Sequence, residues 1–231
     1  MKVLLFGATG MVGQGVLREC LQDSGVTHVL AVGRIPTAIG HPKLRDLILT
    51  DLLSYQNVEP ELAGYDACFF CLGATAAGRT EAEYAAINHA IPVAVGTTLA
   101  RVNPGMTFIY VSGAGTDSTE QGRIMWARVK GRTENDLLRL ALNAFMFRPA
   151  IIQPMHGEIS KTWAYRVLIA TFKPIFPLLR RLFPGFVTTT ERIGRAMLHV
   201  ARTGNTERVL ENRNINIAAQ VVANWSPTRY G

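Results

Sequence analysis

Three glycines near the N-terminus constrain the fold of this chain more than any other feature. Gly7, Gly10 and Gly13 directly follow the apolar run at residues 3–6. Residues 11–22 then carry apolar side chains at helical spacing, which places the glycines in a tight turn between a strand and a helix. A strand that passes through such a turn into a helix is typical of the start of a βαβ unit.

The rest of the chain continues this alternation of strands and helices. Further strands are predicted at residues 27–32, 46–50, 66–71, 107–111 and 144–148, with a short one at 214–217. Helices are predicted at residues 81–101, with a kink or break at Pro92, and at 122–142 and 190–202. The strands are almost wholly apolar, as expected for a parallel sheet that helices cover on both faces.

We therefore predict an α/β protein with a Rossmann-type, doubly wound parallel sheet flanked by helices. It forms a single domain over residues 1–231, because no linker separates its parts. Residues 1–150 are expected to form the dinucleotide-binding core. Residues 151–231 are expected to form a small C-terminal cap on the substrate side, packed over the carboxyl ends of the strands where ligands bind in such sheets.

The chain is basic, with a formal net charge of +7 and a pI of about 9.7, which suits an anionic partner. The densest basic group consists of Lys161, Arg166, Lys173, Arg180 and Arg181. We interpret this group as a solvated or ligand-facing surface and do not expect a nucleic-acid partner, because no nucleic-acid-binding motif accompanies it.

The cysteines and histidines favour neither a disulfide framework nor a metal site. The chain has three cysteines, an odd and sparse set that favours a reducing compartment and a cytoplasmic location. Cys68 and Cys71 have CxxC spacing but lie in a predicted strand, where residues three apart point to opposite faces, so we expect buried thiols that do not pair. The five histidines lack metal-ligand spacing. Neither a signal peptide nor a membrane-length apolar run is evident.

The glycine turn predicts a bound dinucleotide. Gly7 permits the tight turn, Gly10 lets the backbone approach a pyrophosphate, and Gly13 lets the helix pack closely on the strand. The N-terminus of the following helix offers N–H groups and a positive dipole to the phosphates. The spacing is GxxGxxG, and a turn that binds no ligand is the alternative; the position between strand and helix favours the dinucleotide.

The residue after the second strand favours the phosphorylated cofactor. A site for NAD(H) carries an Asp or Glu near this position to hold the ribose 2′-hydroxyl. Here the strand ends in Gly33 and Arg34, and an arginine suits a 2′-phosphate. An exposed loop arginine is the alternative. We predict NADP(H) in preference to NAD(H).

These features resemble the short-chain dehydrogenase/reductase superfamily, and most of all its atypical branch of Tat-interacting-protein-type oxidoreductases and epimerase-like proteins. The resemblance covers about residues 1–150. It implies that the cofactor is bound by Gly7, Thr9, Gly10, Met11, Val12, Gly13 and Arg34, by Asp51 and Leu52 at the adenine, by Cys71, Leu72 and Gly73 at the ribose, by Lys130, and by Arg148 and Pro149 on the nicotinamide side.

The resemblance also implies a catalytic group of Asn88, Ser112 and Lys130, from which this chain departs at one position. The family has a Tyr-x-x-x-Lys pair on the helix after the serine, and Trp126 occupies the tyrosine position here. An indole can donate a hydrogen bond but cannot shuttle a proton. The proton could come from water, Lys130 or Tyr84; catalysis could be slow; or the protein could bind the cofactor without turning it over.

We predict an NADP(H)-dependent reductase of a small apolar carbonyl-type substrate. The alternative is a catalytically weak or inactive protein that senses NADP(H). The aromatic and arginine-rich residues 163–186 leave three uses open: a lid over the substrate, the surface of a homodimer or a shallow membrane contact. We favour the lid or core packing over the membrane.

Overall fold

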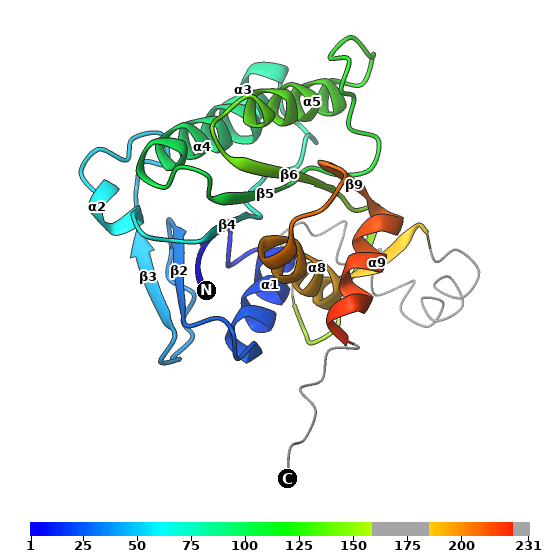
Figure 1. The fold of residues 1–231 in the computed structure, drawn as a ribbon. Helices are drawn as coiled ribbons and strands as arrows, with labels where there is room; N and C mark the ends of the chain where they lie inside the picture. Colours follow the sequence, from blue (N-terminus) through cyan, green and yellow to red (C-terminus); the bar gives the residue numbers. More distant parts are fainter. Residues whose placement is uncertain (159–184, 224–231) are drawn as a thin grey trace.

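The structure is a computed structural model that describes residues 1–158 and 185–223 (Figure 1). Seven strands form one sheet: β1 (Lys2–Phe6), β2 (His28–Gly33), β3 (Leu44–Ile48), β4 (Ala67–Phe70), β5 (Thr107–Val111), β6 (Asn143–Arg148) and β9 (Val209–Glu211). The helices are α1 (Met11–Gln22), α2 (Glu59–Leu62), α3 (Glu81–Ala85), η1 (Ala86–Ala90), α4 (Ile91–Val102), α5 (Met125–Leu138), α8 (Thr190–Thr203) and α9 (Asn212–Ala223).

The sheet is parallel throughout and has the strand order β3-β2-β1-β4-β5-β6-β9. The chain builds outward from β1 in one direction and then from β4 in the other, so the order reverses between these two strands. The loops that leave their carboxyl ends diverge to opposite faces, which opens a crevice there. The predicted doubly wound Rossmann-type sheet is confirmed.

Helices cover both faces of the sheet (Figure 1). On one face, α1, α8 and α9 pack on a buried cluster that includes Leu5, Phe69 and Phe147. On the other, α4 and α5 pack on a second cluster that includes Phe6 and Phe70. Because both faces are covered, both sets of alternating side chains in each strand must be apolar, and this explains the continuous apolar runs.

The predicted helix at residues 81–101 is divided in three. A capping box opens α3, in which the Thr80 hydroxyl accepts from the backbone N–H of Glu83 and the Glu83 carboxylate accepts from the Thr80 N–H. The π-helical turn η1 follows, and α4 begins with Pro92 in its first turn, where a proline has no hydrogen bond to break. The proline therefore marks a change of helical register.

The predicted strand at residues 214–217 is wrong. These residues lie in α9, and β9 comes just before them. The alternation of asparagine and isoleucine suggested a strand, but Ile215 is fully buried and Ile217 is 52% exposed. Burial falls instead at Ile215, Ala218 and Ala219, which is helical spacing.

Other expectations differ in position. The third strand begins two residues earlier than predicted, and the predicted helix at 122–142 is limited to Met125–Leu138. A two-stranded sheet of β7 (Ile151–Gln153) and β8 (Val187–Thr189) was not predicted. The helix predicted at 190–202 is confirmed, with the Thr189 hydroxyl as its N-cap.

The C-terminal third was predicted as a small cap, but its described helices also contribute to the hydrophobic core. Its described helices α8 and α9 complete one layer of the sheet through residues such as Ile193, Met197 and Ile215. The basic group at Lys161–Arg181 and most of the predicted lid at 163–186 lie outside the described residues. Within the described ranges, no helix has the length and hydropathy that a membrane crossing requires.

Candidate functional site

The glycine turn is compact because two of its glycines are in contact with neighbouring backbone. Gly7 has a φ of +83°, and a Cβ placed on it would lie 2.6 Å from the backbone nitrogen of Leu72. A Cβ on Gly13 would lie 2.0 Å from the carbonyl oxygen of Gly7. These two positions therefore exclude every other residue, as the sequence predicted.

Gly10 is different, since protein packing does not require a glycine there. Its φ of −84° suits any residue, and an added Cβ would approach only the Gly7 oxygen, at 3.3 Å. Gly10 is the N-cap of α1 and has no side chain of its own with which to cap the first helical N–H groups. The start of α1 is thus an uncapped, positively polarised end whose glycine keeps the approach clear, which suits a phosphate group.

A cavity of about 440 Å³ extends from this turn toward β2 and β3. Its lining includes Gly7, Thr9, Gly10, Gly33 and Arg34, and also Cys71, Leu72 and Gly73 from the loop after β4. The Arg34 side chain is exposed and has no ion-pair partner among the described residues. It remains available to an anion in this cavity.

Asp46 also lines this cavity and was missed in the sequence. It lies on β3 opposite Ala31, and its carboxylate accepts hydrogen bonds from the Thr37 hydroxyl at 2.9 Å and the Thr37 backbone N–H at 3.2 Å. These bonds fix the loop that carries Arg34. Only the pairing of β3 with β2 brings Asp46 here, and no motif marks it.

The predicted adenine pair, Asp51 and Leu52, is absent from the lining of this cavity. The Asp51 carboxylate instead accepts from the backbone N–H of Leu53 at 2.8 Å. Leu52 is buried, and its carbonyl oxygen accepts from the Tyr55 hydroxyl. The structure thus uses both residues to close their own turn.

A second cavity, of about 540 Å³, continues along the carboxyl ends of β4, β5 and β6. Its wall shares Gly10, Cys71, Leu72 and Gly73 with the first cavity. The other residues of its lining are Met11, Val12, Ala74, Thr75, Val111, Ser112, Gly113, Ala114, Lys130, Pro149, Ala150 and Ile152. The two cavities form one groove, which crosses the sheet at the point where the strand order reverses.

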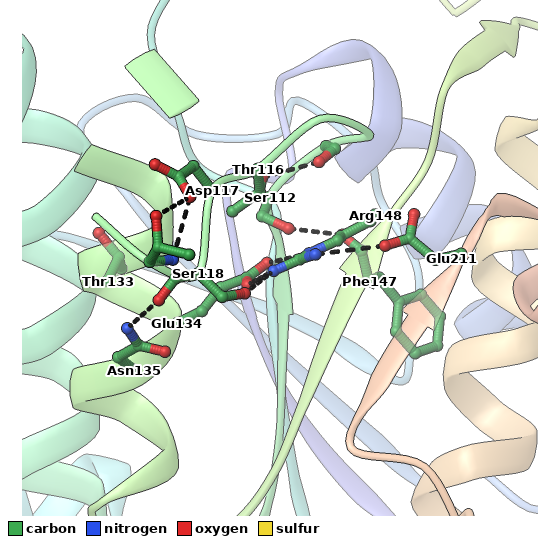
Figure 2. Close-up of polar contacts among 12 residues, drawn as sticks. Ser112, Thr116, Asp117, Ser118, Thr133, Glu134, Asn135, Phe147, Arg148 and Glu211 are labelled. Carbon is green, nitrogen blue, oxygen red and sulfur yellow. Dashed lines mark hydrogen bonds and ion pairs between the residues drawn. The ribbon is translucent and has the colours of Figure 1, made fainter. Parts of the chain in front are cut away.

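Ser112 follows β5 and lines the second cavity. Its hydroxyl donates to the carbonyl oxygen of Phe147 at 3.1 Å, and its backbone N–H donates to the same oxygen at 2.9 Å (Figure 2). This pair of bonds holds Ser112 on β6. The hydroxyl oxygen retains its lone pairs, and the proton can rotate toward a ligand in the groove.

Lys130 reaches the same cavity from α5. Its Nζ donates to the carbonyl oxygens of Ser112 at 2.7 Å and Val111 at 3.3 Å, and lies 5.4 Å from the centre of the Tyr110 ring. Burial disfavours the ammonium form and lowers the pKa of Lys130 to about 8, against the opposing charge of Glu134. The structure therefore brings Ser112 and Lys130 together, as the sequence predicted.

Trp126 lies one turn before Lys130 on α5 but does not line either cavity. The edge of its indole lies 3.5 Å from the point where a Cβ of Gly115 would stand, so the ring packs against the loop after β5. Tyr84, the other aromatic candidate for proton transfer, is buried away from the groove lining, and burial raises its pKa to about 12.

Asn88 supports the groove from behind. It is 1% exposed in the π-helical turn, and its side-chain oxygen accepts from the Ala74 backbone N–H at 3.1 Å. Its backbone carbonyl oxygen accepts hydrogen bonds from the hydroxyls of Tyr110 and Thr133. Asn88 therefore links the loop after β4 to β5 and α5, and does not itself line the second cavity.

The side chain of Arg148 is used inside the protein. Its guanidinium donates to the carboxylates of Glu134 and Glu211 and, at 2.6 Å, to the Ser118 hydroxyl (Figure 2). Pro149 lines the second cavity and Arg148 does not. Within this predicted cofactor segment it is therefore the proline that reaches the cavity, while Arg148 joins α5, β6 and β9.

The cysteines are free, and Cys68 and Cys71 belong to clusters on opposite faces of the sheet, which confirms that these two do not pair. Burial raises the pKa of the Cys71 thiol above its ordinary value. Although Cys71 contributes to the wall shared by the two cavities, this burial keeps its thiol in the protonated, unreactive form.

Comparison with known proteins gives two further findings. A family model described as NAD(P)H-binding matches residues 7–152. The mitochondrial protein FMP52 of Eremothecium gossypii is 23% identical over 212 residues, which cover 90% of this chain and 92% of that protein.

Solved structures share the fold at low sequence identity. The oxidoreductase ylbE of Lactococcus lactis is 12% identical, with a TM-score of 0.65 and full coverage of both chains. The enzyme WbmF of Bordetella bronchiseptica, in complex with NADH, is 15% identical with a TM-score of 0.68, covering 97% of this chain and 78% of that one. The family match confirms the predicted NAD(P)-binding family, and the common fold is consistent with the resemblance to the atypical short-chain dehydrogenase/reductase group.

Proposed function

This chain belongs to the NAD(P)H-binding family, and on that premise we propose that it is an NADP(H)-dependent reductase of a small apolar carbonyl compound. The observation that carries the proposal is the meeting of Ser112 and Lys130 in the second cavity, which adjoins the glycine turn. At a substrate carbonyl oxygen, a hydroxyl can polarise the bond and an ammonium can donate a hydrogen bond or a proton, and both help a carbonyl reduction.

The residues of the groove fit the cofactor. Gly10 keeps open the space in which a side chain would meet a pyrophosphate, and the uncapped start of α1 supplies the N–H groups. The loop from Cys71 to Gly73 would lie along the ribose, and Lys130 and Pro149 would flank the nicotinamide half. When bound, the reduced nicotinamide supplies a hydride.

Ser112 would polarise the substrate carbonyl. Its hydroxyl is held beside the groove by the Phe147 carbonyl oxygen, and it can turn its proton toward a substrate oxygen. Lys130, with the N–H that the carbonyl oxygens of Val111 and Ser112 leave over, would hold the substrate oxygen in place by a charge-assisted hydrogen bond. The apolar part of the lining, including Met11, Val12 and Ile152, favours a small apolar substrate.

The preference for NADP(H) rests on Arg34. Its guanidinium lines the first cavity and has no competing ion pair in the described part of the chain, so it can bind a 2′-phosphate. Asp46 in the same cavity could serve a ribose hydroxyl, but it already accepts two hydrogen bonds from Thr37. These contacts support the phosphorylated cofactor.

The second candidate function is a protein that senses NADP(H) without turnover. Trp126 favours it, because no ionisable phenol stands one turn before Lys130. Fluorescence titration with NADPH and NADH, followed by assay on a panel of carbonyls and quinones, tests both functions. Binding without turnover of any compound would reject the reductase and favour the sensor.

Replacement of Trp126 distinguishes an enzyme that lost its activity with the tyrosine from one in which the indole itself has a role. Trp126→Tyr restores the phenol, and Trp126→Phe is its control because it keeps an aromatic ring without a proton to give. A large gain that only the tyrosine variant shows would indicate lapsed catalysis. Loss of an existing activity in both variants would show that the indole has a role of its own.

We also propose a cytoplasmic location, because an odd and sparse set of three cysteines favours a reducing compartment. The relative FMP52 is named as mitochondrial, which makes the compartment a direct test. Fractionation of cells that express the tagged full-length chain decides between the two, and enrichment with mitochondria would overturn the cytoplasmic assignment.

A further inference from the structure

We propose that Lys130 itself is the proton donor to the substrate oxygen, in place of the phenol that Trp126 has displaced. This inference rests on the proposed reductase function. It assigns the lysine a step in the reaction as well as a place in the binding site.

The contacts of Lys130 match the needs of a donor that alternates between ammonium and amine. Two of its N–H groups point to the carbonyl oxygens of Val111 and Ser112. A neutral amine keeps two N–H groups and can preserve both bonds. Beyond these two bonds, Nζ has no further hydrogen-bond acceptor among the described residues, although the Tyr110 ring lies 5.4 Å away, and Lys130 lines the second cavity. Loss of the third proton to a ligand would therefore leave the other contacts intact.

The other groups near the cavity are poorer donors. Tyr84 and Tyr110 are buried and absent from its lining, and burial raises the pKa of each phenol. Cys71 contributes to the lining, but burial raises the pKa of its thiol too. Trp126 has no proton that it can exchange. Among the described ionisable side chains of this lining, Lys130 is the one whose proton can leave near neutral pH.

The charges around Lys130 keep it from being locked as an ion pair. Glu134 lies one turn further along α5 and favours the ammonium through its charge. Its carboxylate is bonded to the Arg148 guanidinium from β6, which compensates that charge (Figure 2). The Tyr110 ring from β5 faces the ammonium, and Cys71 is the other ionisable residue of the cavity lining. No carboxylate is bonded to Nζ among the described residues.

The reaction balances with these groups. When bound, the reduced nicotinamide would supply a hydride, with both electrons of its C–H bond, for the new bond at the carbonyl carbon. The π electrons of the carbonyl move to its oxygen, which takes one proton from the Lys130 ammonium. The alcohol and the oxidised nicotinamide leave, and the neutral amine regains a proton from water.

The first experiment measures the titration of Lys130 directly. The chain has five lysines, so the side-chain amines of protein labelled with ¹⁵N-lysine can be followed individually by NMR. Lys130→Arg identifies the resonance by its loss. We expect the Lys130 amine to titrate near pH 8, with and without NADP⁺. A titration near the ordinary lysine value of 10.5 would overturn the proposal, whatever the activity.

The second experiment separates proton donation from positioning. Lys130→Arg keeps a cation that can bond both carbonyls but does not release a proton. We expect NADPH binding within about threefold of wild type and a fall in kcat of about 100-fold or more, the usual contribution of a general acid. In the wild type, kcat should fall as the pH rises through the titration of the donor, because the donor must start protonated.

The third experiment supplies the missing amine from solution. In Lys130→Ala, methylammonium is expected to restore turnover in proportion to its concentration, while trimethylammonium, which is bulkier, restores less. Lys43→Ala is the matched control, because Lys43 also donates to two backbone carbonyls, those of Leu21 and Asp23, outside the groove. It should keep wild-type turnover and show no response to amines.

The outcomes distinguish this proposal from the function on which it rests. If the wild type turns over nothing in the carbonyl panel, the reductase fails and the proton donor fails with it. If the wild type is active and Lys130→Arg retains its rate and pH profile, the proton donor alone is wrong, and the phenols or water supply the proton.

Discussion

The guanidinium of Arg148 and the carboxylate of Glu134 form an ion pair inside the protein, where 1% of the Glu134 side chain is exposed. Arg148 has a second carboxylate partner, Glu211, whose side chain is more than half exposed. The pair joins the strand that leads to Pro149 with the helix that carries Lys130. The contribution of the Arg148–Glu134 pair to stability therefore depends on burial as well as on charge. If one partner is removed, the other cannot turn to water.

The single variant of this pair should lose more stability than the double variant. Arg148→Met leaves a buried carboxylate without its cation and is expected to lower the free energy of unfolding by about 3–5 kcal/mol. Arg148→Met combined with Glu134→Leu removes both charges and should recover most of that loss. Urea denaturation measures both. A double variant that is less stable than the single one would contradict a simple ion pair.

The same double variant also tests whether Arg148 binds the cofactor. We expect it to keep NADPH affinity within about threefold of wild type, because the guanidinium is used by Glu134, Glu211 and Ser118. A large loss of affinity in a folded double variant would return Arg148 to the cofactor site that the sequence predicted.

The glycines of the turn should separate binding from folding. Gly13→Ala places a Cβ 2.0 Å from the Gly7 oxygen and should destabilise the fold by several kcal/mol. Gly10→Ala meets no such clash, and as a poorer N-cap should cost about 1 kcal/mol while lowering NADPH affinity more than tenfold. Gly40→Ala, with open space around it, is the control. Thermal denaturation and fluorescence titration measure the two effects, and unchanged binding in Gly10→Ala would refute its role at the pyrophosphate.

Arg34 and Asp46 should shift cofactor preference in opposite directions. Arg34→Ala is expected to weaken NADPH binding about tenfold or more, the value of a charge-assisted hydrogen bond, with little change for NADH. Asp46→Asn removes a negative charge from the same cavity and should favour NADPH over NADH. Arg45→Ala is the control, because Arg45 pairs with Glu61 outside the cavity. Equal losses for both cofactors in Arg34→Ala would argue against a 2′-phosphate site.

Lys130 should also give a characteristic dependence of stability on pH. Its pKa is about 8 in the folded protein and 10.5 in the unfolded reference. Between these values the unfolded state binds more protons, so the free energy of unfolding gained from this group rises with pH. Relative to Lys130→Met, the wild type should gain about 2 kcal/mol between pH 7 and pH 10. Both proteins contain the same tyrosines and cysteines, so the titration of these groups cancels when the two free energies of unfolding are subtracted. A flat difference would show that the ammonium is well solvated.

The fold could be predicted largely from local sequence, since strands buried on both faces must be apolar and their helices are amphipathic. The turn at Gly7, Gly10 and Gly13 could be placed for the same reason: its backbone geometry depends on neighbouring residues. The strand predicted at 214–217 failed because a short alternation of apolar and polar residues also fits one turn of a helix. The length of the element and the burial of its side chains decide between strand and helix, and both depend on the tertiary structure.

The site was harder to predict where it depends on strand pairing. Asp46 enters the first cavity through the register of β3 on β2, which single-sequence patterns do not fix. Arg148 was expected at the cofactor because of its neighbours in sequence, but its partner Glu134 lies on a different element. Ser112 and Lys130 could be placed because strand ends and helix faces bring them to the same edge.

The π-helical turn at Ala86–Ala90 fixes the permitted length of this part of the chain. A π turn holds one more residue than an α-helical turn, and such turns arise within α-helices as single-residue insertions. Removal of that residue would rotate all of α4 by about 100° relative to α3, as one residue of helix does. Val95 and Leu99 would leave the sheet, or Asn88 would leave the loop it supports. Insertions and deletions should therefore be tolerated at the loop ends of this segment and selected against within it.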